Sequence, residues 1–63
     1  MNFDLATAAR LIKVRAHDLE SFARRRIVGY EVGGETRFTR IGLIRFAVTF
    51  GLSTRSLSGL SDA

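Results

Sequence analysis

The sequence predicts a small α+β domain in which two short helices precede a β-hairpin and a third helix follows it. Two stretches before residue 26 place apolar residues at helical spacing, and a third stretch does so from residue 40. Between them lies a segment rich in β-branched and aromatic residues around a Gly-Gly pair, which is typical of a hairpin.

Two amphipathic helices are expected before the hairpin. The first runs from Leu5 to Ile12, with Asp4 as a favourable N-cap residue. The second runs from Ala16 to Arg25, after a break around residues 13 and 14, and ends in a run of three arginines. A basic run suits the negative end of a helix, so this cluster also has a purely electrostatic explanation.

The hairpin and the third helix follow directly. Residues 27–38 are expected to form a two-stranded hairpin, because the Gly33-Gly34 pair supplies the positive φ angles of a tight turn. Thr39 should cap a helix from Arg40 to about Phe50, closed by Gly51. We therefore expect one domain over residues 1–52 and a flexible tail over residues 53–63, which is rich in serine and glycine.

Composition restricts the chemistry of the chain. Its 63 residues can form only one domain, and they include no cysteine and a single histidine. Neither a disulfide nor a zinc site is therefore expected. The carboxylates are scattered singly, so we expect no enzymatic activity, no small-molecule substrate and no cofactor. No apolar run approaches the roughly 20 residues that span a bilayer, and a cytoplasmic protein is expected.

The charge balance favours a nucleic acid as partner. The net charge is +4, and nine of the ten basic residues are arginine. The arginine fork binds phosphate oxygens and the guanine edge in bidentate geometry, which lysine does not do. A solvated surface that is merely basic is the alternative interpretation.

The order of elements resembles the MerR-like winged helix-turn-helix family, which includes phage excisionases, AlpA-type regulators and BldC-type regulators. The resemblance covers Phe3 to about Gly51 and rests on DLATAARLIKV, RAHDLESFARRRIVGYEVGGETRF and TRIGLIRFAV. These segments are similar to the opening helix of the family, to its recognition helix with the wing, and to the helix after the wing. The resemblance implies a winged helix-turn-helix fold that binds double-stranded DNA.

The second helix carries the candidate base contacts. Its outward face should present His17, Ser21 and Arg24, because a helical wheel places them opposite the apolar side. Glu20 is expected to pair with Arg24, which would leave Arg25 as the stronger contact. The complete set of candidate DNA-binding residues is Lys13, Arg15, His17, Ser21, Arg24, Arg25, Arg37 and Arg40. For the helix residues, the alternative is an ordinary solvated helix face. For Arg37 in the hairpin, the alternative is a strand-edge charge that discourages aggregation.

The third helix should carry more apolar surface than one core can cover. Either its Leu43–Phe46–Phe50 side or its Ile41–Ile44–Val48 side should stay exposed in a monomer. We expect a second copy to cover that side, giving a dimer or a head-to-tail array. The expected interface residues are Leu43, Phe46, Val48 and Phe50. In the alternative, the tail folds back through Leu52, Leu57 and Leu60.

Together these observations predict a nucleoid-associated protein that binds double-stranded DNA cooperatively and with sequence preference. It would act as a transcriptional regulator or as an excision factor that sets the direction of recombination. The alternative is a non-enzymatic protein-interaction or self-assembly module with the same fold. The acidic pair Asp18 and Glu20 and the apolar third helix favour that alternative.

Overall fold

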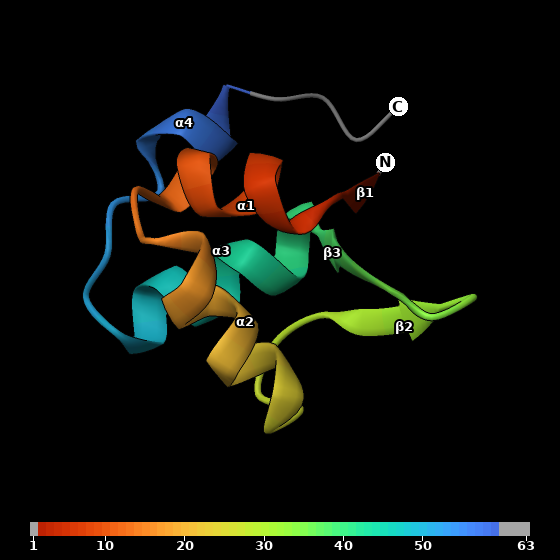
Figure 1. Cartoon of the computed structure of the whole chain (residues 1–63). Helices are drawn as coiled ribbons and strands as arrows, with labels where there is room; N and C mark the ends of the chain where they lie inside the picture. Colours follow the sequence, from red (N-terminus) through yellow and green to blue (C-terminus); the bar gives the residue numbers. More distant parts are fainter. Residues whose placement is uncertain (1, 60–63) are drawn as a thin grey trace.

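A computed structural model describes residues 2–59 as four helices and a three-stranded antiparallel sheet (Figure 1). The elements in order are β1 (Asn2–Phe3), α1 (Leu5–Ile12), α2 (Ala16–Arg24), β2 (Tyr30–Val32), β3 (Glu35–Thr39), α3 (Arg40–Thr49) and α4 (Arg55–Ser58). The predicted α+β class is confirmed, and the arrangement is consistent with a small winged-helix-like fold. Within residues 2–59, no helix is long and apolar enough to cross a membrane.

Side-chain caps begin two of the helices where the sequence predicts them. The Asp4 carboxylate accepts a hydrogen bond of 2.8 Å from the amide of Thr7, at the start of α1. The Thr39 hydroxyl accepts one of 2.9 Å from the amide of Gly42, at the start of α3. Hydrogen bonds from Thr7, backbone first and then side chain, hold the pKa of Asp4 below its ordinary value. The caps satisfy amides that a helix leaves without partners.

The sheet is one strand wider than the two-stranded wing that the sequence predicts. Strand β3 lies in the centre, with β2 on one side and β1 on the other. The two glycines between β2 and β3 have φ angles of 58° and 81°, as a tight hairpin turn requires. Strand β1 has two residues and places Phe3 opposite Phe38. It has no sequence signal of its own, because so short a strand forms only when a partner edge is present.

Phe38 lies at the centre of a core to which every helix contributes. Its side chain is fully buried, as are those of Ile12, Leu19, Leu43 and Leu57. The turn before β2 passes close to this ring, because Gly29 lies against it: a Cβ atom at Gly29 would sit 2.8 Å from the Phe38 ring. The backbone of Gly29 also has a φ of 81°, which disfavours any residue with a side chain.

Residues 53–59 do not form the flexible tail expected from sequence. Residues 55–58 form α4, which packs against α1 and α3, and Leu57 is fully buried. Leu52 is partly buried against the same core. The folded-back alternative is therefore correct for these two leucines, because their burial outweighs the low helix propensity of the serines around them. Leu60 and the rest of residues 60–63 lie outside the described residues.

Two of the four residues predicted for the oligomer interface are buried in the core around α3. Leu43 and Phe46 are 0% and 5% exposed, so they belong to the core of the domain and not to an interface. The helix contacts α1, β3 and α4, which bury that side. Val48 is 68% exposed and Ile41 is 55% exposed. Of the predicted Ile41–Ile44–Val48 side, Ile41 and Val48 remain uncovered and Ile44 packs partly against the core. Phe50, from the other side, is 45% exposed.

The close approach of Gly29 to Phe38 leads to a stability prediction with an internal control. Gly29→Ala should lower the free energy of unfolding by about 2 to 3 kcal/mol, because it adds backbone strain and a clash with the buried ring. Gly34 has the same φ of 81° and open space around it. Gly34→Ala should therefore lower stability by only about 1 kcal/mol. Urea unfolding measures both, and equal losses would contradict the predicted clash.

Candidate nucleic-acid interface

Helix α2 is attached to the domain by one face only. Leu19 is fully buried, and the Phe22 ring packs on the rings of Phe46 and Phe50, with centroids 5.0 Å away in both cases. The opposite face is open to solvent, with His17 exposed and Ser21 half-buried. The predicted outward face of α2 is therefore the observed one, because the spacing of its two large apolar residues determines which side packs.

The outward face of α2 carries two carboxylates, Asp18 and Glu20, against one arginine, Arg24. Arg24 donates to the Glu20 carboxylate at 3.1 Å, the pairing that its spacing predicts. Asp18 is exposed near the start of the helix, where a negative charge is favourable. Arg24 is thus partly neutralised by its own helix, and the net positive charge must come from residues outside this pair.

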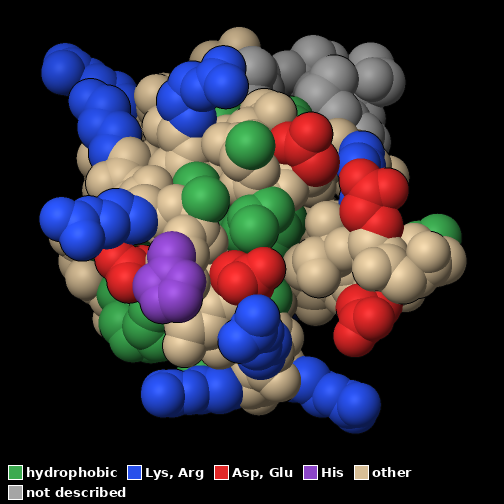
Figure 2. Space-filling view, in the orientation of Figure 1, with side chains coloured by type: hydrophobic (Ala, Val, Ile, Leu, Met, Phe, Trp, Pro, Cys, Tyr) green, Lys and Arg blue, Asp and Glu red, His purple; other side chains and the backbone are tan. Residues whose placement is uncertain are grey.

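Free positive charge lies at both ends of α2. Lys13 and Arg15 precede the helix, and Arg25 and Arg26 follow it. All four side chains are exposed, and none of them has an ion-pair partner within residues 2–59. Figure 2 shows blue side chains along two edges of this view, with the acidic groups between them and toward the hairpin. Arg26 was not among the predicted site residues, although it completes the arginine run that the sequence shows.

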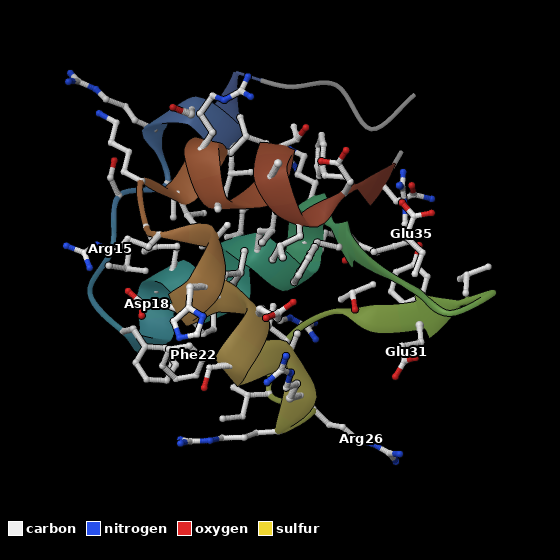
Figure 3. The ribbon with its side chains drawn as sticks, in the orientation of Figure 1. Arg15, Asp18, Phe22, Arg26, Glu31 and Glu35 are labelled. Atoms are coloured by element: carbon white, nitrogen blue, oxygen red, sulfur yellow. The ribbon has the colours of Figure 1, made fainter. Side chains whose placement is uncertain are left out.

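The separation of these two basic ends matches a dimension of duplex DNA. Figure 3 shows Arg15 at one end of α2 and Arg26 beyond the other. The nine residues of α2 span about 14 Å at the rise of an α-helix. The major groove of B-DNA is about 12 Å wide and is bordered by a phosphate strand on each side. A helix of this length laid across the groove brings one basic end near each strand.

The hairpin has a different electrostatic character. Glu31 and Glu35 are exposed on its two strands (Figure 3), and Glu31 lines a groove together with Ala23 of α2 and Arg26. The one basic residue of the hairpin, Arg37, is held within the chain. Its guanidinium donates to the Asn2 side chain at 2.6 and 3.0 Å and to the Glu35 carboxylate at 2.9 Å. Arg37 therefore fastens β1 to β3, and its side chain is only 28% exposed.

Arg40 also has a partner inside the domain. Its Nε donates to the backbone carbonyl of Leu57 at 2.9 Å, in a partly buried position. This bond joins the start of α3 to α4. The sequence predicts Arg40 as a DNA contact from its place at the start of the third helix, because a partner 17 positions along the chain leaves no local signal.

The described residues offer no cluster for metal binding. No group of three or more histidine, cysteine, aspartate or glutamate side chains within residues 2–59 could hold a metal ion. The grooves beside α2 are lined mainly by apolar and basic side chains, with Asp18 and Glu31 as the acidic exceptions. The chemistry of the surface is that of charge and hydrogen bonding.

Comparisons with protein-family models, with curated proteins and with solved structures found no match to this chain. Its interface is therefore interpreted from its own geometry and charge.

The partners of Arg37 predict that it stabilises the domain. Arg37→Ala should lower the free energy of unfolding by about 1 kcal/mol, because hydrogen bonds to two side chains are lost. Arg25→Ala removes the same charge from an exposed side chain with no partner within residues 2–59, so it should leave stability unchanged. Thermal unfolding of the two variants measures the difference. An Arg37→Ala variant as stable as the wild type would show that its partners contribute nothing.

Proposed function

We propose that this protein binds double-stranded DNA by laying α2 in the major groove. It acts without enzymatic activity, as a transcriptional regulator or as an architectural factor in recombination. The observation that supports this best is that the basic groups at both ends of α2 have no ion-pair partner within residues 2–59, while the outward face of the helix exposes His17 and Arg24. The element order of helix, turn, helix and hairpin agrees with the winged-helix resemblance of the sequence.

The ends of α2 and its outward face make different kinds of contact with the duplex. Basic groups at the ends of α2 bind phosphates, which gives affinity and sets the docking angle without reading sequence. His17 and Ser21, between those ends, lie where hydrogen bonds to base edges are made. Arg24 takes part once it exchanges Glu20 for guanine or phosphate. The acidic hairpin lies beside the duplex and is no phosphate clamp, because its exposed charges are negative.

Salt dependence tests the proposal directly. The four unpaired basic groups at the ends of α2 should release about four counterions, so the logarithm of the binding constant should fall with a slope of about −3 to −4 against the logarithm of salt concentration. Fluorescence anisotropy on a random-sequence duplex measures this slope. Absence of binding at about 50 mM salt, the low end of the usual range, would refute the proposal.

Two variants separate a specific surface from general basicity. Arg25→Ala should make the slope less negative by about one. Arg55→Ala removes the same charge from α4, which lies on the other side of α1 from the end of α2 (Figure 1). It should leave the slope near the wild-type value. Equal effects of both variants would mean that only net charge attracts the duplex.

A second candidate function, self-assembly, is favoured by one observation on α3. Ile41 and Val48 are seven positions apart, so they lie on one side of the helix, and both are more than half exposed. Exposed apolar groups of this kind mark contact surfaces when they cluster. Self-assembly is compatible with DNA binding, since neighbouring copies on a duplex would bind cooperatively.

The exposed side of α3 makes the second candidate testable apart from the first. Val48→Asp should convert any dimers or larger species to monomers while leaving the helical circular dichroism unchanged, because the side chain is 68% exposed. Sedimentation velocity over a concentration series gives the distribution of species. A wild type that stays monomeric throughout the series would eliminate the self-assembly function and leave DNA binding untouched.

A further inference from the structure

Three helices of this domain end in the same hydrogen-bonded turn. In each, an amide two or three positions beyond the helix donates to a carbonyl five residues earlier, the arrangement known as a Schellman motif. The donor and acceptor pairs are Val14 to Ala9, Ile27 to Phe22 and Leu52 to Ala47, at 3.0, 3.1 and 2.7 Å. The motif requires one residue in the left-handed conformation just before the donor. Those residues are Lys13, Arg26 and Gly51, with φ angles of 59°, 60° and 70°.

The three turns differ in what occupies the left-handed position. Glycine adopts this conformation without strain, and the turn after α3 uses it. A residue with a Cβ atom crowds the following carbonyl oxygen there. The turns after α1 and α2 nevertheless carry lysine and arginine, which have long side chains and no local hydrogen bond to compensate. The chain thus accepts strain at two of three equivalent positions.

Arg26 lines two grooves beside α2, one of them together with Glu31. No hydrogen bond or ion pair within residues 2–59 accounts for the two basic residues. Lys13 and Arg26 are exposed, and neither side chain has an ion pair or a hydrogen bond within residues 2–59. A positive charge at a helix C-terminus is favourable, but α1 already has Arg10 in its last turn and α2 has Arg24. The dipole of α2 is also served by Arg25, directly after the helix.

What the two strained residues share is their position around α2. Lys13 lies in the turn that leads into α2, and Arg26 lies in the turn that leads out of it. Gly51, the unstrained equivalent, follows α3 and belongs to neither turn that flanks α2 in the chain. The basic residues therefore stand where a helix in the major groove meets the phosphates on its two sides.

We propose that Lys13 and Arg26 are a pair of phosphate anchors, one for each DNA strand, kept in strained turns for that contact. This inference rests on the proposed DNA-binding function and names two residues that contact the phosphates in the complex. Arg26 is thereby a DNA-binding residue that sequence reasoning did not select. At both positions the basic residue lowers the free energy of unfolding and raises the affinity for DNA.

The glycine variants Lys13→Gly and Arg26→Gly test this opposition. Each removes the strain, so each should raise the unfolding midpoint by a few degrees, on the order of 4 °C. Each also removes a phosphate contact, so affinity for a random-sequence duplex at low salt should fall roughly tenfold and the salt slope should become less negative by about one. Calorimetry and fluorescence anisotropy on the same preparations give both numbers.

Three further variants serve as controls. Lys13→Arg and Arg26→Lys keep both the charge and the strain, so stability and binding should stay near the wild type. Gly51→Lys creates the same strained basic turn at the end of α3. It should lower the unfolding midpoint, because it introduces at the end of α3 the strain that the native pair carries.

The outcomes separate this inference from the function on which it rests. If the wild type binds DNA and the glycine variants bind with unchanged affinity and slope, the anchors are disproved while the function stands. If the glycine variants are less stable than the wild type, the two charges serve the helix dipoles and the inference is also overturned. If the wild type binds no duplex, both proposals fail together.

Discussion

The buried ring of Phe38 connects the hairpin to the helices. It belongs to the central strand, pairs across the sheet with Phe3 and lies against the backbone of Gly29 on the way out of α2. Strand β3 runs directly into α3, so the position of this ring also sets where α3 crosses the domain. In a chain this small few side chains are fully buried, and each must join several elements at once. The packing around the Phe38 ring therefore fixes how the hairpin, α2 and α3 are oriented relative to one another.

That packing leaves α2 exposed in a particular way. The helix is held through Leu19 and through the contacts of Phe22 with two rings of α3, all on one side. The turns at its two ends are closed by backbone hydrogen bonds, which leave the side chains of those turns free. A helix fixed at its ends and along one side can present its other side to a large partner without losing core contacts. This geometry suits insertion into a groove.

Charge is distributed unevenly over the same architecture. The exposed charges of the hairpin are acidic, and its arginine is used to hold β1 in place. The unpaired basic groups precede and follow α2, while the helix itself carries Asp18 and the Glu20–Arg24 ion pair. In the winged-helix arrangement that the sequence resembles, the hairpin is a DNA contact. Here Arg37 is held by hydrogen bonds to Asn2 and Glu35, which gives it a structural role in the hairpin.

The sequence by itself determined the elements whose causes are local. Asp4 and Thr39 cap helices through residues three positions away, the Gly33-Gly34 turn needs only its own backbone freedom, and the outward face of α2 follows from helical spacing. Only the tertiary structure decided what depends on distant partners. Strand β1 exists because it pairs with Thr39 and Phe38, α4 because Leu57 finds a place against α1 and α3, and Arg37 is occupied by a residue 35 positions away. The left-handed turns at Lys13 and Arg26 also cannot be predicted from residue type, because glycine is the usual residue at such positions. Local patterns identify helices, caps and turns, whereas the free energy of long-range burial decides which basic side chains remain free to bind.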